Sequence, residues 1–240
     1  MHRFFIPPEW IRGDTVFLQD ATAHQLRNVL RMQPGARIIV LNNTGAEYEI
    51  ELTVVEKAEV RGDVIAKRPA AGEPTAAITL YQCLLKKDNF EWVLQKCTEI
   101  GVSRFVPVIS QRTVVQSVKD NKIARWERII TEAAEQSGRG RVPDLTDPVE
   151  FAQAITEAAT YDRALIPWEE ASARTLRDVH LPGKKRIALF IGSEGGFEAR
   201  EIAVAADAGA IPVTLGARIL RAETAAVVAS AITLHEVEQT

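Results

Sequence analysis

The spacing of apolar residues changes near residue 70 and predicts two regions of different architecture. Before this point the pattern favours short strands, separated by turns rich in glycine, proline or asparagine. Over residues 47–52 polar and apolar side chains alternate, as in a half-buried strand. Strands are predicted over residues 3–6, 15–18, 36–41, 47–55 and 60–67, with one helix over residues 21–31. Such a series of short strands indicates a small β-barrel.

After residue 75 the predicted strands and helices alternate, which is typical of an α/β domain with a mostly parallel sheet. Strands are predicted over residues 77–85, 105–109, 161–166, 186–191 and 211–215. Helices are predicted between Asp88, as the N-cap, and Gly101, around residues 123–134, and over residues 198–208 and 222–237. The stretch KRPAAGEPT, residues 67–75, has the composition of a linker. We therefore expect one domain over residues 1–72 and a second over residues 73–240.

The last predicted helix, residues 222–237, carries apolar side chains in nearly every direction around its axis. A helix that is apolar all round is buried on most of its sides. The sheet of its own domain can cover one side. Another side is therefore expected to be covered by something else, such as a second subunit.

Composition excludes several classes of protein. Of the 240 residues, 46% are hydrophobic and 25% are charged, as in an average globular protein, which excludes a disordered or collagen-like chain. The net charge of −3 gives no global sign of nucleic-acid binding, although a local basic patch can lie within it. The first residues, MHRFFIPPEW, lack the apolar stretch of a signal peptide, and no apolar run is long enough to span a bilayer. We therefore expect a cytoplasmic protein without membrane contact.

Cysteine and histidine chemistry has little support in the sequence. Cys83 and Cys97 lie in apolar runs, so we expect buried free thiols rather than a disulfide. The four histidines show no metal-ligand spacing with the cysteines, so no metal is expected. The remaining candidates for chemistry are loops.

A glycine-rich turn, GSEGGF at residues 192–197, follows one predicted strand and precedes a helix. In parallel α/β sheets ligands bind at the carboxyl ends of the strands, and glycine lets the main chain approach them closely. The pattern is neither a phosphate loop nor a dinucleotide fingerprint, and Glu194 would repel phosphate. We therefore expect a neutral or cationic ligand. The alternative is a tight connection that binds nothing.

A second loop, LGARILRAETA at residues 215–225, leads into the last helix. Ile219 and Leu220 are apolar where connecting loops are usually polar, and Arg218, Arg221 and Glu223 flank them. In one interpretation the two apolar side chains enter the core and Glu223 only stabilises the helix N-terminus. Because two glycine-bearing loops follow adjacent strands, we favour the other interpretation, a shared pocket.

Basic residues in the first region give a modest sign of nucleic-acid binding. His24, Arg27 and Arg31 are spaced i, i+3 and i+7, which places them on one face of the predicted helix. Residues 1–37 contain five arginines and three acidic residues. The alternative is an ordinary solvated face. Arg139, in the segment QSGRGR, adds a similar sign.

Six segments of the chain resemble, in this order, the RsmE family, whose members are 16S rRNA uridine-N3 methyltransferases of the SPOUT superfamily. The segments are Arg3–Ile6, His24–Arg31, Lys96–Val102, Glu132–Arg139, Ile191–Phe197 and Ile219–Ala225. The resemblance extends over essentially the whole chain. One departure is Ser193, where the family usually has proline, and we expect a less rigid loop there. Glu198 also stands where a Ser or Thr cap is common.

The resemblance implies an α/β fold, in which a SPOUT-type trefoil-knotted parallel-sheet domain is preceded by a PUA-like β-barrel domain that binds RNA. It implies S-adenosylmethionine as the methyl donor, 16S ribosomal RNA or the small ribosomal subunit as the substrate, and a homodimer through the C-terminal domain. The residues that it assigns to donor binding are Leu165, Gly192, Gly195, Leu215, Gly216, Ile219 and Leu220.

For catalysis, we predict that Arg221 stabilises the charge that develops on the uracil oxygens and that Glu223 or Glu194 accepts the N3 proton. His24, Arg27 and Arg31 are predicted to contact RNA, with Arg139 added across the dimer. Two other classes of function stay open. One is a non-catalytic RNA-binding protein, and the other is a nucleotide-binding α/β enzyme that acts on a small molecule.

Overall fold

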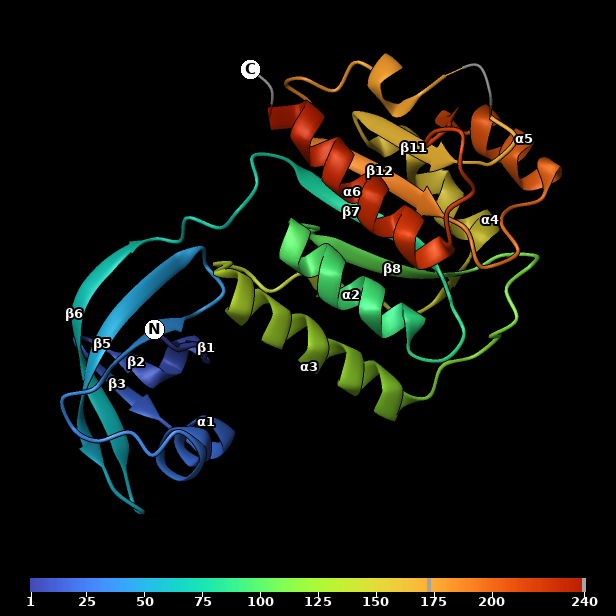
Figure 1. Ribbon diagram of the computed structural model, residues 1–240. Helices are drawn as coiled ribbons and strands as arrows, with labels where there is room; N and C mark the ends of the chain where they lie inside the picture. Colours follow the sequence, from blue (N-terminus) through green and yellow to red (C-terminus); the bar gives the residue numbers. More distant parts are fainter. Residues whose placement is uncertain (172–173, 239–240) are drawn as a thin grey trace. The chain divides into compact units, whose positions relative to one another are not determined.

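A computed structural model, which describes residues 1–171 and 174–238, divides the chain into two compact units (Figure 1). Unit 1 consists of Met1–Glu73 and Ala134–Val142, and unit 2 of Pro74–Ala133 and Pro143–Thr240. The segment 134–142 thus packs with the N-terminal residues, although the sequence assigned it to the second domain. The domain boundary at residues 72 and 73 stays a prediction.

Unit 1 is built on one curled sheet (Figure 1). Its strands are β1 (Arg3–Phe5), β2 (Ile11–Arg12), β3 (Thr15–Leu18), β4 (Arg37–Leu41), β5 (Ala46–Val55) and β6 (Val60–Pro69). They pair in the order β1-β4-β5-β6-β3-β2, and only the pairing of β1 with β4 is parallel. Val16, Leu26, Ile38 and Ile50 belong to its apolar core. The strand-rich first domain is confirmed, and its barrel is an open half-barrel.

The helix predicted over residues 21–31 is shorter and of mixed type. Helix α1 (Asp20–His24) continues as a single π-helical turn, η2 (Gln25–Val29), and Pro8–Trp10 form a 3-10 turn, η1. Arg31 lies beyond the last helical residue and has a φ of 51°. A π-turn contains more residues than an α-helical turn. His24, Arg27 and Arg31 therefore do not share one helical face, and the structure corrects that prediction.

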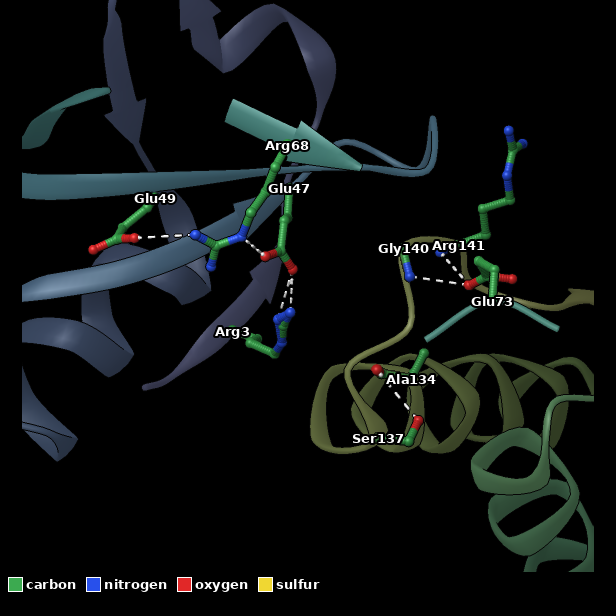
Figure 2. Close-up of polar contacts among 9 residues, drawn as sticks. All are labelled: Arg3, Glu47, Glu49, Arg68, Glu73, Ala134, Ser137, Gly140 and Arg141. Carbon is green, nitrogen blue, oxygen red and sulfur yellow. Dashed lines mark hydrogen bonds and ion pairs between the residues drawn. The ribbon is translucent and has the colours of Figure 1, made fainter. Parts of the chain in front are cut away.

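The acidic residues of β5 form ion pairs with arginines on neighbouring strands. Figure 2 shows the Glu47 carboxylate between the guanidinium groups of Arg3 and Arg68, and Glu49 on the other side of Arg68. The Glu47 side chain is only 6% exposed, so these charges are partly removed from water. These arginines are therefore neutralised within unit 1.

Arg139 also forms an ion pair inside unit 1. Its guanidinium donates from Nε to Glu73 Oε1 at 3.3 Å and from Nη2 to Glu73 Oε2 at 3.1 Å. The same carboxylate accepts the main-chain N–H groups of Gly140 and Arg141, at 2.9 and 3.1 Å (Figure 2). The Arg139 side chain is 2% exposed. The Arg139 guanidinium is thus buried against Glu73 in this chain, and its contact with RNA across a dimer stays a prediction.

Unit 2 contains a parallel sheet. Its strands are β7 (Ala77–Cys83), β8 (Arg104–Ile109), β9 (Asp144–Leu145), β10 (Val149–Glu150), β11 (Arg163–Pro167), β12 (Arg186–Ile191) and β13 (Ala210–Val213). They follow the order β10-β8-β7-β12-β11-β13, with β9 beside β8, and each of these pairings is parallel. The predicted α/β architecture is confirmed, and the central strands place their carboxyl ends at one edge.

Helices flank this sheet. They are α2 (Asn89–Ile100), α3 (Asp120–Ser137, whose last four residues belong to unit 1), α4 (Phe151–Ala154), α5 (Ala199–Asp207) and α6 (Ala222–Glu238), with 3-10 turns η3 (Ile155–Thr160) and η4 (Leu176–Asp178). Helix α2 begins after Asp88 and ends at Gly101, as predicted. Among the described residues, no helix combines the length and the apolar character needed to cross a membrane.

Helix α6 lies along β7 and β12, next to α2 (Figure 1). Ala226, Ala229 and Leu234 are buried. Val228 and Ile232, in contrast, remain only half-buried. Part of the apolar surface of α6 is thus left uncovered by the described residues of this chain.

The two cysteines are free and buried, which confirms their prediction. Burial raises the pKa of the Cys83 and Cys97 thiols to about 12 in each case. We therefore expect native protein at pH 8 to resist a water-soluble thiol reagent for minutes, because the thiolate is the reactive form. Protein in concentrated guanidinium chloride should react at both positions. Rapid labelling of the native chain would contradict the buried environment.

Replacing Glu73 with alanine should destabilise unit 1, because the buried Arg139 guanidinium would lose its carboxylate. Removing one partner of a buried pair typically lowers the free energy of unfolding by about 3 kcal/mol. Glu132→Ala is the control, because Glu132 and Arg128 form an exposed pair on α3 and such pairs contribute roughly 0.5 kcal/mol. Denaturant unfolding measures both changes. Similar small losses in the two variants would show that the Glu73 contact is not a stabilising one.

Candidate functional site

The loops after β12 and β13 line one cavity of about 460 Å³ at the carboxyl edge of the unit 2 sheet. The first loop contributes residues 191–197, and the second contributes residues 214–223 together with Ala225. A cavity of this size is typical of sites for small organic ligands. The prediction that the two loops share a pocket is therefore confirmed.

Most of the predicted donor-binding and catalytic residues line this cavity. They are Gly192, Glu194, Gly195, Leu215, Gly216, Ile219, Leu220, Arg221 and Glu223. Leu165 does not. It is fully buried inside β11, where it pairs with Leu189 on one side and Ile211 on the other. The structure thus corrects the position of Leu165, and β11 first reaches the cavity at Pro167.

Besides Pro167, at the end of β11, further lining residues were not among the predicted site residues. Trp168 and Glu169 follow the carboxyl end of β11, and Asn89 is the first residue of α2. The rule that ligands bind beyond the carboxyl ends of parallel strands could have identified Trp168 and Glu169. Asn89 carried no comparable signal, because only the folding of the chain brings it to the same edge.

The loop after β12 folds back on itself. The N–H of Gly196 donates to the carbonyl of Ser193 at 2.9 Å and closes a turn. A Cβ atom at Gly192 would lie 3.1 Å from the carbonyl carbon of Gly196, so a side chain there would crowd the main chain of the turn. One carboxylate oxygen of Glu194 accepts the main-chain N–H of Lys86 at 2.9 Å. The loop is therefore tied to the segment that follows β7.

The loop after β13 turns at Gly216, whose φ of 113° lies in a region that other residues rarely adopt. The Thr214 hydroxyl accepts the N–H of Gly216 at 3.2 Å and donates to its carbonyl at 3.3 Å. Ile219 is 83% exposed. The interpretation in which Ile219 enters the core is therefore wrong, and its apolar side chain remains accessible.

Charged groups surround these apolar walls. Arg218 and Arg221 are exposed, and no hydrogen bond or ion pair to another described residue engages either guanidinium. The carboxylates of Glu169, Glu194 and Glu223 also lie at the cavity. The site thus combines apolar surface, exposed guanidinium groups and carboxylates, but its glycine pattern is not one that binds phosphate.

The predicted RNA-binding residues lie in unit 1. His24 and Arg27 line a depression there, together with Lys57 and the acidic residues Asp20 and Glu59. Arg27 Nη1 donates to the main-chain oxygens of Glu56 and Lys57, at 3.1 and 3.2 Å. Arg31 is exposed but does not line this depression. No group of three or more His, Cys, Asp or Glu in the described part of the chain is arranged to bind a metal ion.

Family models match both regions of the chain. A model described as an RNA methyltransferase domain matches residues 72–234, and one described as an RNA methyltransferase PUA domain matches residues 18–65. Among curated proteins, the chain is 35% identical over 235 residues to ribosomal RNA small subunit methyltransferase E of Synechocystis, covering 96% of this chain and 76% of that protein. The Bacillus subtilis protein of that name is 31% identical over 250 residues, covering 99% of this chain and 98% of the relative.

Two solved methyltransferase structures are similar to this chain over nearly its whole length. The crystal structure of ribosomal RNA small subunit methyltransferase E from Neisseria gonorrhoeae, bound to S-adenosyl methionine, superposes with a TM-score of 0.91 at 34% identity. The match covers 99% of this chain and 98% of that one. A putative methyltransferase from Legionella pneumophila, in complex with the same cofactor, gives a TM-score of 0.88 at 32% identity, covering 97% and 96%.

Proposed function

The chain belongs to the ribosomal RNA small subunit methyltransferase E family, and we propose that it methylates N3 of a uridine in 16S ribosomal RNA, with S-adenosylmethionine as the donor. The observation that carries the proposal is that the two glycine-bearing loops share a cavity at the carboxyl edge of the parallel sheet. The predicted catalytic side chains Arg221, Glu223 and Glu194 all lie at this cavity.

The residues of the cavity fit S-adenosylmethionine. Trp168, Leu215 and Leu220 supply apolar surface for a flat base, and the carboxylates of Glu194 and Glu223 complement a positive charge. The absence of side chains at Gly192 and Gly216 lets the main chain approach a ligand. When bound, S-adenosylmethionine supplies an electrophilic methyl group on a sulfonium that becomes a neutral thioether.

Arg221 and Glu223 have complementary roles in the proposed reaction. Loss of the N3 proton leaves negative charge on the two uracil oxygens, and the Arg221 guanidinium, which has no partner among the described residues, stabilises this charge. Glu223 accepts the proton. Glu194 is the second candidate, but one of its oxygens already accepts a hydrogen bond from Lys86.

The proposal also covers the RNA contacts of the protein, its oligomeric state and its location in the cell. Unit 1 binds the RNA, with His24, Arg27 and Arg31 as contacts. The chain forms a homodimer through its C-terminal domain, in which a second copy covers the half-buried Val228 and Ile232 of α6 and the 42% exposed Trp92 of the neighbouring α2. The protein acts in the cytoplasm, on small-subunit RNA.

The purified protein should form 3-methyluridine in 16S RNA or small ribosomal subunits that lack it, as measured by mass spectrometry of the digested RNA. Arg221→Ala should slow the reaction about 100-fold, as expected when a group that stabilises developing charge is lost. Its affinity for S-adenosylmethionine, measured by calorimetry, should stay near that of the wild type.

Arg128→Ala is the control for this measurement, because Arg128 is an exposed residue of α3. An absence of product with wild-type protein and either substrate would favour a non-catalytic RNA-binding protein. A collapse of donor affinity in Arg221→Ala, with normal residual turnover, would instead show that Arg221 has a different role.

Replacing both Arg27 and Arg31 with alanine should weaken RNA binding and lower its salt dependence. Each lost phosphate contact reduces the slope of log K against log salt by roughly 0.7 to 0.9. Arg37→Ala is the matched control, because Arg37 pairs with Glu49 and Glu51 in the same unit. Filter binding at several salt concentrations measures the slope. An unchanged slope in the double variant would exclude these arginines as phosphate contacts.

A further inference from the structure

The glycine-rich loop after β12 is bonded to a short segment after β8, Ser110–Thr113, which we call the β8 turn. Arg112 Nη1 donates to the carbonyl of Gly195 at 2.9 Å. In the opposite direction, the Ser193 hydroxyl donates to the carbonyl of Arg112 at 3.1 Å and accepts the N–H of Gly195 at 3.4 Å. Arg112 Nε also lies 3.7 Å from Glu198 Oε1, at the start of α5. Hydrogen bonds that involve both main-chain and side-chain groups thus join the two segments.

The β8 turn is a firm anchor because its own polar groups are satisfied. The N–H of Ser110 donates to Thr113 Oγ1 at 3.0 Å, the two hydroxyls lie 2.9 Å apart, and the N–H of Thr113 donates to the carbonyl of Ser110 at 3.0 Å. Ser110 and Thr113 are 5% and 3% exposed. Gln111 adds a main-chain hydrogen bond of 3.0 Å to Glu201 of α5. The turn is therefore formed independently of the Arg112 side chain.

The approach of the two segments is close. A Cβ atom at Gly195 would lie 3.0 Å from the Cβ atom of Arg112, so a side chain at residue 195 would crowd Arg112 and push the two segments apart by a few tenths of an ångström. Ser193 is 5% exposed, whereas the Arg112 side chain is 48% exposed. An exposed guanidinium adds little to global stability. Its hydrogen bond to the Gly195 carbonyl instead holds a loop that lines the cavity.

We propose that Arg112 is a positioning residue that, together with the Ser193 hydroxyl, holds the glycine-rich loop in the conformation that binds the methyl donor. This inference rests on the proposed function. It also assigns a role to Ser193, where proline is usual, because the hydroxyl restrains the loop through hydrogen bonds. A loop that is ordered before binding loses less conformational entropy when the ligand binds. Arg112 therefore acts on donor affinity rather than on the chemical step.

The test compares Arg112→Ala, Arg112→Lys, Ser193→Ala and the double variant Arg112→Ala/Ser193→Ala. Calorimetry with S-adenosylmethionine should show about a tenfold weaker Kd for Arg112→Ala, as expected for the loss of a charged hydrogen bond. Arg112→Lys should be intermediate, because lysine can still donate to the Gly195 carbonyl. The double variant should lose less free energy of donor binding than the two single variants lose together, because the two residues act in one network.

Kinetics separate positioning from a merely structural role. With saturating S-adenosylmethionine, kcat of Arg112→Ala should stay within about twofold of the wild type, while KM for the donor rises with Kd. The melting temperature without ligand should change little. Arg200→Ala is the control, because Arg200 is an exposed arginine of α5, and no bond joins it to the loop among the described residues.

Two results would overturn the inference. One is a wild-type Kd for the donor in both Arg112→Ala and Ser193→Ala. The other is an unchanged donor Kd with a raised KM for RNA in Arg112→Ala, which would make Arg112 an RNA contact. A wild-type protein that binds no S-adenosylmethionine would refute the proposed function itself, so the two failures are distinguishable.

Discussion

The parallel pairing of β12 with β7 on one side and β11 on the other is the constraint on which the site depends. Parallel strands end at the same edge, so the loops after β11, β12 and β13 meet there although they are far apart in the sequence. The cavity exists because two of these loops contain glycines where the main chain folds back or turns sharply, at Gly192 and Gly216. A side chain at residue 192 would crowd the main chain of Gly196, and one at residue 216 would strain a backbone whose φ is 113°.

Several arginines of unit 1 differ in their partners from two arginines at the cavity of unit 2. In unit 1, Arg3 and Arg68 neutralise Glu47, and Arg139 is enclosed by Glu73. These ion pairs join β5 to β1 and β6 of the half-barrel, and Glu73 to the segment 134–142. At the cavity of unit 2, Arg218 and Arg221 have no such partner among the described residues. These two guanidinium groups are therefore available to a substrate.

Local sequence patterns predicted the elements of both units well where one physical signal dominated. The strand over residues 186–191 and the helix between Asp88 and Gly101 agree with the structure because periodicity, caps and turns all favour the same boundaries. The helix after Asp20 was predicted too long, since a π-turn and the left-handed Arg31 end it early. Apolar spacing carries no signal for such a local change of helix type.

The sequence by itself determined the alternation of elements, the two glycine-bearing loops and most of the residues that line the cavity, because each depends on neighbours along the chain. Tertiary structure alone decided that Asn89 joins them, and that Leu165 stays inside the sheet. It also decided that Arg139 is buried against Glu73. Burial and ion pairing depend on partners distant in the sequence, and no local pattern can specify which partner a charge meets.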